Sequence, residues 1–560
     1  MYHLIANHLF LLYLCRFMQK LELQNTHFYF RLTTACFPRN AIPILMIELT
    51  PAPRSSVSYF FSSICRSALS AKTFKSACSS LVCLNSRQKP ESQVLFSQSN
   101  ILYDTSLLFF HPQNIHLSIP ISYVKMISSS TQTEVLQMAK KNLIVGQSGG
   151  PTAVINSSLY GVVSEGLAHS DEIGHVYGMV NGIEGFLAGR ILDFEEALPG
   201  EKLSYLKHTP GAYLGSCRYK LPESLEDPVY PELFRKFEEM NIGWFFYIGG
   251  NDSMDTVSKL SRYAAKVGSS IRVIGEPKTI DNDLIHTDHT PGFGSAARYV
   301  ASTVREITLD ANVYEKKSVT IIEIMGRHAG WLTAASALAR KYQGDNPLFI
   351  YLPETDFDQD AFLKDLEKAF ETNCNLIVCV SEGIHDSKGT FICEYDSSVG
   401  TDSFGHKMLA GCGKYLENLV RSRLGVKARS VELNVSQRCS AAMISAADQQ
   451  EAVAAGKFGV NAALNGETGK MVSFIRQTDE NGTYQMVCGL EDVNEICNQE
   501  KVVPAEWITS DGHDVTEDFI RYARPLIQGN IEVPLGEDGL PAFVYLSLIH
   551  ISEPTRLALI

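Results

Sequence analysis

The residues of this chain best suited to chemistry lie in the segment KTIDND, residues 278–283. The apolar run before it, residues 271–274, predicts a short strand that a glycine and a proline then end. Just past the strand, Lys278, Asp281 and Asp283 can supply a cation, a general base and a metal ligand around one anionic group. The same segment also suits a solvent-exposed turn, because Asn and Asp are common turn formers.

Two other segments have the order buried strand, glycine turn and helix. Residues 143–145 are apolar and run into GQSGGPT, and residues 242–248 are apolar and run into GGNDS. This order aims backbone N–H groups and the positive end of a helix at a phosphate. It also occurs as ordinary strand-to-helix geometry, and Ser253 suits a helix cap as well as a phosphate contact.

A further loop of small residues, 209–217, precedes Arg218. A guanidinium behind small residues can hold a phosphate through two parallel hydrogen bonds, although an arginine here also suits ordinary surface. Together with residues 278–283, these loops should converge at the carboxyl edge of one parallel sheet, where open α/β sheets bind ligands. This convergence favours a phosphate site over four unrelated turns.

A second α/β unit follows in the chain. The patterns predict a helix over residues 296–311, strands over 318–324 and 375–380, a helix over 411–424, and a strand over 429–438 with an arginine at each end. Residues 466–546 are expected to form a smaller sheet region packed on the two lobes, with residues 543–546 as a strand and no site residues. The predicted fold class is therefore α/β, with two Rossmann-like lobes of mainly parallel strands between helices.

The predicted division of the chain follows from these elements. It assigns residues 138–290 to the first lobe, with some return of the chain after about 430, residues 291–430 to the second lobe, and residues 431–546 to the return segment and the small sheet region. Residues 547–560 continue no pattern, resemble translated adapter sequence, and are expected not to be native.

Residues 1–137 are rich in Ser, Phe, Leu and Cys and show no sustained periodicity. They suit an organelle-targeting leader, a small extra domain, or a reading frame extended upstream of the true start. We favour the last interpretation, because an apolar strand begins directly after Met138.

The composition is that of a globular protein, with 45% apolar and 20% charged residues among 560. Residues 1–137 contain 11 of the 49 basic and 5 of the 62 acidic residues, so the rest of the chain, with 38 and 57, is acidic. An acidic chain disfavours nucleic acid as a partner. None of the 13 cysteines forms a CxxC pair and no apolar run is long enough to span a membrane, so we expect a cytoplasmic protein with reduced thiols.

Seven motifs occur in one order between Met138 and Leu546: SGGPTAVIN, LGSCR, GGNDS, PKTIDND, PGFGSA, MGRHAGW and SEG. Their combination resembles the phosphofructokinase family, and within it the pyrophosphate-dependent branch. The resemblance implies the phosphofructokinase fold and reversible phosphoryl transfer from pyrophosphate to the 1-hydroxyl of D-fructose 6-phosphate, serving glycolysis and gluconeogenesis. It also implies Mg²⁺ as the cofactor and a homodimer or homotetramer with shared active sites.

The resemblance assigns roles to the residues that match the family's motifs. The implied catalytic residues are Asp281, as general base, and Lys278, Asp252 and Arg327. The implied contacts to the sugar phosphate are Thr279, Ile280, Asp281, Met325, Gly326, Arg327, Glu382, Arg438 and, reaching across from a neighbouring subunit, Arg429. The implied phosphoryl-donor contacts are Gly150, Arg218, Gly250 and Ser253, and the implied metal ligands are Asn251 and Asp283.

Two residues favour pyrophosphate as the donor. ATP-using relatives usually have glycine where this chain has Asp252 and Lys278. A carboxylate at 252 would repel the α-phosphate of a nucleotide, and Lys278 supplies a fixed positive charge that pyrophosphate needs. Asn251 departs from the family's usual aspartate, and its amide oxygen can still ligate Mg²⁺, but without charge.

Two other functions fit the sequence. The first is an ATP-dependent phosphofructokinase, which a coupled assay with each donor distinguishes. The second is a catalytically silent regulatory subunit that binds a sugar phosphate. Such a subunit would be expected to lose the base or a metal ligand, so the presence of Asp281, Asp283 and Lys278 argues against it.

Overall fold

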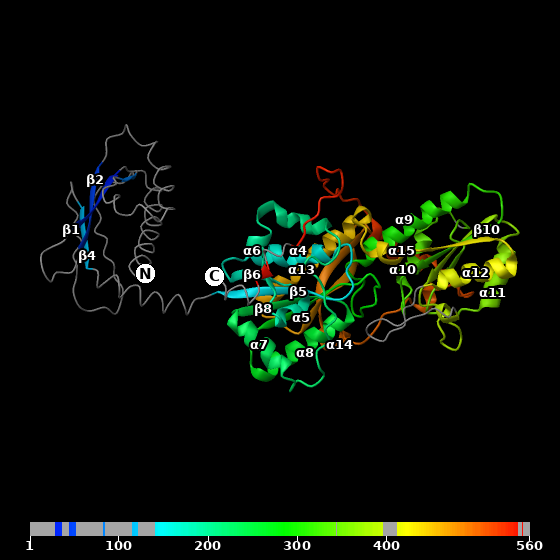
Figure 1. Cartoon of the computed structure of the whole chain (residues 1–560), viewed down its shortest axis with the longest axis horizontal. Helices are drawn as coiled ribbons and strands as arrows, with labels where there is room; N and C mark the ends of the chain where they lie inside the picture. The colour runs from blue at the N-terminus through cyan, green and yellow to red at the C-terminus, as the bar shows by residue number, and fades with distance from the viewer. Residues whose placement is uncertain are drawn as a thin grey trace. The chain divides into compact units, whose positions relative to one another are not determined.

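The computed structural model describes residues 140–342, 344–395 and 411–546 and, as strands only, residues 28–35, 44–51, 82–84, 115–120 and 551–552. The chain separates into two compact units, residues 1–139 and 140–560 (Figure 1). The described strands of the first unit form one antiparallel sheet in the order β3-β1-β2-β4, namely β1 (Phe28–Ala35), β2 (Ile44–Pro51), β3 (Val82–Leu84) and β4 (Ile115–Pro120). The origin proposed for residues 1–137 stays a prediction.

The larger sheet of the second unit has the order β15-β14-β9-β8-β5-β6-β7-β16. The strands from β14 to β6 run parallel, and β15, β7 and β16 are antiparallel to their neighbours. The strands are β5 (Lys141–Gln147), β6 (Ile173–Met179), β7 (Ile191–Asp193), β8 (Ile242–Gly249), β9 (Arg272–Pro277), β14 (Lys470–Thr478), β15 (Tyr484–Asp492) and β16 (Ile551–Ser552).

Helices cover both faces of this sheet (Figure 1). One face carries α4 (Ile155–Ala168) and α13 (Ala446–Leu464), and the other carries α5 (Gly182–Leu187), α7 (Val229–Glu239) and α8 (Asn251–Val267). Alternate residues of a strand point to opposite faces. Accordingly, Leu143 and Val145 of β5 enter the first apolar layer and Ile144 enters the second.

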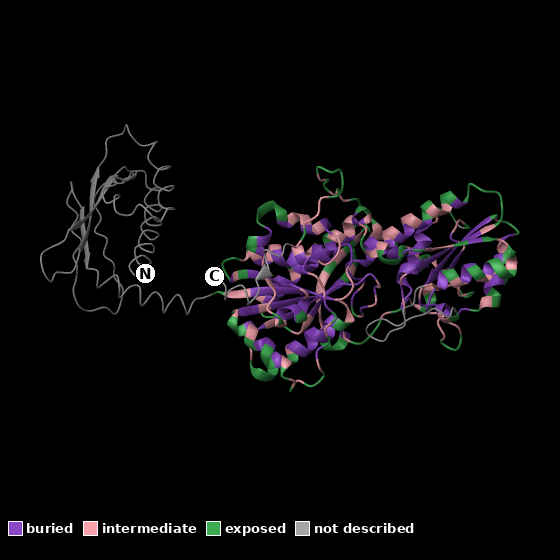
Figure 2. Cartoon of the chain, in the orientation of Figure 1, coloured by how far each residue is buried: buried purple, intermediate pink, exposed green. Residues whose placement is uncertain are grey.

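The second sheet is entirely parallel, in the order β11-β12-β10-β13. Its strands are β10 (Ser318–Ile324), β11 (Phe349–Tyr351), β12 (Asn375–Ser381) and β13 (Lys427–Glu432). One face packs on α9 (Phe293–Ala311) and α10 (Trp331–Ala335), the other on α11 (Gln359–Ala369) and α12 (Cys412–Leu424). Burial on both faces explains the continuous apolar run of β12 and the mostly apolar sequence of β10, which Figure 2 shows as buried strands. The predicted α/β class with two lobes is confirmed.

Three predicted elements are wrong. The strand expected over residues 429–438 ends at Glu432, and η4 (Asn434–Arg438) follows as a 3-10 helix. Residues 466–546 do not form a separate sheet, because β14 pairs with β9 and, with β15, extends the first one. Residues 543–546 form no strand.

The remaining described elements are short. They are α6 (Phe194–Ala197), η1 (Gly200–His208), η2 (Ser336–Ala339), η3 (Ile392–Tyr395), η5 (Ala441–Met443), α14 (Val493–Ile496), η6 (Ala505–Trp507), α15 (Glu517–Ala523) and η7 (Arg524–Ile527). Among the helices that the structure describes, none combines the length and the apolar character needed to cross a membrane.

Candidate active site

The loops that follow β5, β8 and β9 meet at one edge of the first sheet, because these strands are parallel neighbours. The N–H of Lys278 donates to the carbonyl of Gly249 (3.0 Å) and so joins two of the loops. The loop that ends at Arg218 joins them as well, because Ser216 Oγ donates to the carbonyl of Gly149 (2.7 Å). The predicted convergence of the four segments is therefore confirmed.

Lys278 lies against two glycine turns and is only 5% exposed. A Cβ atom on Gly149 would lie 3.2 Å from the Lys278 Nζ, and one on Gly250 would lie 4.0 Å from it. A side chain at Gly149 would therefore crowd the ammonium group, and Gly250 lies within ordinary contact of it. The lysine charge and the backbone of both turns face the same small volume, as an anion site requires.

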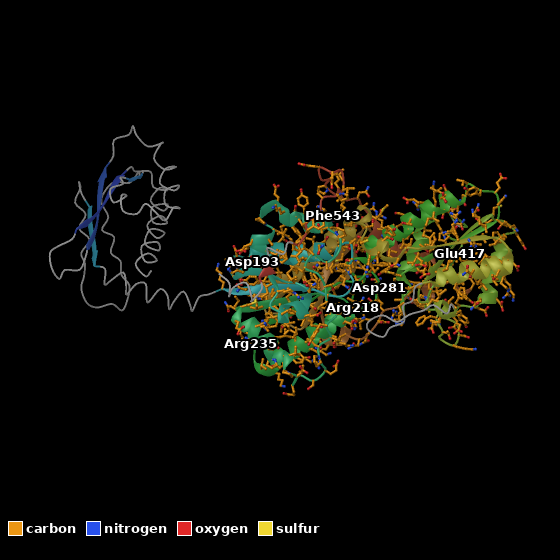
Figure 3. The ribbon with its side chains drawn as sticks, in the orientation of Figure 1. Asp193, Arg218, Arg235, Asp281, Glu417 and Phe543 are labelled. Atoms are coloured by element: carbon orange, nitrogen blue, oxygen red, sulfur yellow. The ribbon has the colours of Figure 1, made fainter. Side chains whose placement is uncertain are left out.

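Four charged side chains surround this lysine. Burial lowers the pKa of Lys278 to about 8. The carboxylates of Asp281 and Asp283 act against this shift, and the guanidinium groups of Arg438 and Arg218 add to it. Figure 3 labels Arg218 and Asp281, which both act on the charge of Lys278. The site thus combines two carboxylates with three cations.

Asp281 is oriented by its neighbour Thr279. Thr279 Oγ1 donates to Asp281 Oδ2 (3.1 Å) and accepts the N–H of Asp281 (3.0 Å). Burial raises the pKa of Asp281, while the Thr279 hydrogen bond and the charges of Lys278 and Arg438 oppose that rise. Ile280, between them, packs into the apolar core of the second lobe. Its backbone is therefore held while the carboxylate stays in the site.

Asn251 and Asp283 fit a Mg²⁺ ion. Asn251 Oδ1 and Asp283 Oδ1 are buried and have no hydrogen-bond partner among the described residues. Both residues contact one segment, since Asn251 Nδ2 donates to the carbonyl of Gln499 (2.9 Å) and the carbonyl of Asp283 accepts the N–H of Lys501 (2.7 Å). Unpaired oxygens of this kind are the ligands that Mg²⁺ prefers.

A small pocket opens beside Asp281 at the ends of β10 and β12. Its lining consists of Glu323, Ile324, Met325, Glu382, Glu432 and Asn434. Burial raises the pKa of Glu382 to about 7, and the Asp281 carboxylate contributes to the rise. Gly326 has φ +149°, and a Cβ there would lie 2.6 Å from the carbonyl oxygen of Ala329, so glycine is needed at this turn. The pocket is acidic, and all of its lining residues belong to the second lobe.

A sequence profile described as phosphofructokinase matches residues 142–463, more than half of the chain. The chain belongs to the phosphofructokinase family.

Similar proteins cover nearly the same region. Pyrophosphate--fructose 6-phosphate 1-phosphotransferase of Halomonas elongata is 38% identical over 413 residues, which are 73% of this chain and 97% of that protein. The protein of the same name from Methylococcus capsulatus is 39% identical over 424 residues, 75% of this chain and 99% of its own. The crystal structure of pyrophosphate-dependent phosphofructokinase from Marinobacter aquaeolei has a TM-score of 0.64 and 37% identity, covering 72% of this chain and 95% of that one.

Arg438 lies between the residues expected to bind the phosphoryl donor and those expected to bind the sugar phosphate. A Cβ atom on Gly150 would lie 3.0 Å from an Arg438 guanidinium nitrogen, so this arginine contacts the donor-side turn. It also acts on the charge of Asp281. The 3-10 turn η4 thus brings Arg438 close to both the Gly150 turn and Asp281.

Four other predicted residues differ in their exposure and in the elements that carry them. Asp252 is exposed in the first turn of α8, and Ser253 is buried behind it at 2% exposure. Ser253 makes no side-chain cap of that helix. Arg327 is half-buried in the turn after β10. Arg429 is not brought to the site: it is exposed on the edge strand β13 and pairs with Asp310 at 3.8 Å.

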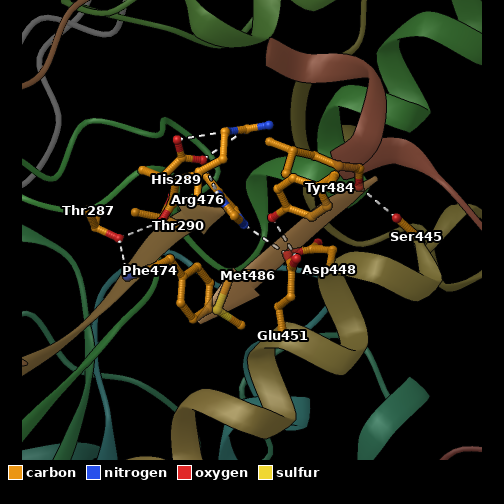
Figure 4. A network of polar contacts seen from close by, with 12 residues as sticks. Thr287, His289, Thr290, Ser445, Asp448, Glu451, Phe474, Arg476, Tyr484 and Met486 are labelled. Atoms are coloured by element: carbon orange, nitrogen blue, oxygen red, sulfur yellow. Dashed lines mark hydrogen bonds and ion pairs between the residues drawn. The ribbon is translucent and has the colours of Figure 1, made fainter. Parts of the chain in front are cut away.

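A buried polar network holds the loop of residues 278–290 in place through Asp288 and His289 (Figure 4). His289 lies between Asp288 (2.8 Å) and Glu451 (2.9 Å), and their hydrogen bonds outweigh burial in raising the His289 pKa. Arg476 of β14 donates twice to Asp288, at 2.9 Å each, and its guanidinium lies over the Tyr484 ring. Strand β14 is thereby fixed to the loop.

The interpretation of residues 466–546 as lacking site residues missed Lys501 and Tyr522. Both contact the loop of residues 278–290 directly. Asn282 was also not given a role, although it lies between the two carboxylates. The Asp288–His289 pair follows the KTIDND motif closely. It could have indicated a polar network, because a buried histidine needs hydrogen-bond partners. Nothing in the spacing indicates that Glu451, 162 positions later, is the second partner of this histidine.

Proposed function

We propose that this chain transfers a phosphoryl group from inorganic pyrophosphate to the 1-hydroxyl of fructose 6-phosphate, giving fructose 1,6-bisphosphate and phosphate reversibly. The observation that carries this proposal is the buried ammonium of Lys278 against two glycine turns, with Asp281 and Asp283 beside it. The names of the relatives from Halomonas elongata and Methylococcus capsulatus support it. The activity is assigned to the cytoplasm.

Asp281 acts as the general base. Its carboxylate takes the proton of the sugar 1-hydroxyl as that oxygen bonds to phosphorus, and the bond from phosphorus to the bridging oxygen breaks to release phosphate. Burial raises the Asp281 pKa, which makes its carboxylate a stronger base than a solvated one. The Thr279 hydrogen bonds keep it in one orientation.

The other residues position and neutralise phosphate, which accounts for most of the catalysis of phosphoryl transfer. Lys278, Arg218 and the turns at Gly150 and Gly250 face the donor. Asn251 and Asp283 would hold Mg²⁺, which would supply positive charge to neutralise phosphate oxygens. Met325, Gly326, Arg327, Glu382 and Arg438 face the sugar phosphate.

The donor is tested by a coupled assay of purified protein with fructose 6-phosphate and Mg²⁺. We expect turnover with pyrophosphate and a rate with ATP lower by about two orders of magnitude or more, since the buried cation favours the small donor. Rapid turnover with ATP and none with pyrophosphate would instead show an ATP-dependent enzyme.

We also propose that Arg429 completes the sugar-phosphate site of a neighbouring subunit in a homodimer or homotetramer. Three exposed apolar side chains support an interface here: Leu309, Val313 and Tyr314, at 67%, 69% and 57% exposure, lie at the end of α9 beside the Asp310 partner of Arg429. Apolar groups gathered at one place on the surface are typical of contacts between subunits.

Mixing two inactive variants tests the shared site. After joint unfolding and refolding, equal amounts of Asp281→Asn and Arg429→Ala should regain about a quarter of wild-type activity, because half of the dimers are hybrid and one of their two sites is intact. Each variant refolded alone is the control. Activity of the mixture that equals the mean of the two controls would place Arg429 outside the neighbour's site.

A further inference from the structure

Asn282 fixes the turn that separates the two carboxylates of the site. It is fully buried and has a left-handed backbone with φ +55°, which asparagine tolerates better than most residues. Its Oδ1 accepts the N–H of Thr290 (3.1 Å) and its Nδ2 donates to the hydroxyl of Tyr522 (2.8 Å). Both the oxygen and the nitrogen of the Asn282 amide therefore form hydrogen bonds that hold the loop in place.

Tyr522 holds this loop at a second point. Its hydroxyl accepts from Asn282 and donates to the backbone carbonyl of Asp288 (2.7 Å). The ring is packed against Trp331 (5.4 Å between centroids) and Trp507 (5.2 Å). Because the ring is enclosed by aromatic groups, its hydroxyl occupies one position relative to the loop.

Lys501 adds a third connection. Its Nζ donates to the carbonyls of Thr287 (3.0 Å) and Asp288 (2.8 Å), and its N–H donates to the carbonyl of Asp283 (2.7 Å). Tyr522 and Lys501 both come from the segment after residue 463, where the match to the family profile ends. The C-terminal segment thus holds the loop at both Asp283 and Asp288.

We propose that Tyr522 is a positioning residue for the phosphoryl transfer. Acting through Asn282, its hydroxyl sets the turn that presents Asp281 to the sugar hydroxyl and Asp283 to the metal. This inference rests on the proposed function. Its physical reason is that a misplaced base loses the near-attack geometry even when the substrates still bind.

The test compares two tyrosine-to-phenylalanine variants. Tyr230 is the matched control: it is a buried tyrosine of α7, and its hydroxyl donates to the carbonyl of Pro222 (2.5 Å) rather than to the loop. For Tyr522→Phe we expect kcat to fall by about tenfold to a hundredfold while both KM values stay within about twofold of wild type. For Tyr230→Phe we expect an unchanged kcat.

A second variant removes the same hydrogen bond from its other end. Asn282→Gly lacks the amide but still adopts a positive φ. Because it also loses the contact with the Thr290 N–H, it should lower kcat at least as much as Tyr522→Phe. The double variant should be no slower than the slower single variant, because the two residues act through one contact. If Tyr522→Phe does not fold, Asn282→Gly alone carries the test.

Two outcomes would overturn the inference. One is that the two phenylalanine variants have the same kcat. Where only Asn282→Gly can be measured, the corresponding outcome is that Asn282→Gly keeps the wild-type kcat. The other is a double variant whose losses multiply. Wild-type turnover with pyrophosphate is measured first, so that a failure of the proposed function is recognised before the variants are compared.

Discussion

Asp281→Asn lowers the pyrophosphate-dependent kcat by about 10²- to 10⁴-fold, the range found when a general base is removed. The substitution keeps the size of the side chain and the Thr279 hydroxyl as a donor to it. It removes the negative charge and the proton acceptor. Steady-state kinetics in the direction of fructose 1,6-bisphosphate formation gives the value.

Binding of fructose 6-phosphate should survive in this variant, because in the proposed mechanism the sugar phosphate is held mainly by residues of the second lobe. Titration calorimetry measures that binding without turnover. Asp255→Asn is the control for a buried carboxylate, since Asp255 pairs with Lys259 (2.6 Å) on α8 away from the loop. An Asp281→Asn enzyme with nearly full kcat would remove the base from the mechanism and favour a silent, sugar-phosphate-binding subunit.

Lys278→Gly is expected to lower kcat/KM for pyrophosphate by about 10²- to 10³-fold, as loss of a preorganised charge does elsewhere. The ammonium is buried and lies against Gly149, so no other cation can replace it without movement of the backbone. Lys278→Arg is a poor substitute for the same reason. Initial rates over a range of pyrophosphate concentrations test this.

Adding Asp252→Gly should raise the ratio of ATP to pyrophosphate use. Asp252 is an exposed carboxylate in the first turn of α8, where it offsets the positive end of that helix. Its removal restores attraction for a further phosphate of a nucleotide. If the double variant keeps the donor ratio of Lys278→Gly, the charge-exclusion argument for Asp252 is wrong.

The pH profile of the wild type provides an internal check on Lys278. The lysine is charged below its pKa of about 8 and neutral above it. In the free enzyme, kcat/KM for pyrophosphate should therefore decline as pH rises through about 8. The Lys278→Gly variant should lack this decline.

The strands at the centre of both sheets could be predicted because their chemistry is unambiguous. Burial on two faces requires a continuous apolar run, and β8 and β12 each have one. The segment after β13 misled the prediction, because Leu433 and Val435 continue its alternation. In the structure the chain turns at Asn434, whose φ is +44°, and enters η4.

The prediction of the candidate site succeeded where its residues follow a strand directly, as Lys278 and Gly250 do. Their place at the sheet edge follows from topology alone. It failed for Tyr522, Lys501 and Arg476, because their role depends on β14 joining β9 across nearly 200 residues. Local periodicity contains no information about such a pairing.

That pairing has a consequence for biosynthesis. During translation, β5, β8 and β9 leave the ribosome long before β14 and α13, which complete the same sheet and cover one of its faces. The nascent first lobe therefore exposes an unpaired strand edge and an uncovered apolar surface while the whole second lobe is being made. We expect such a chain to need chaperone protection until its last hundred or so residues emerge.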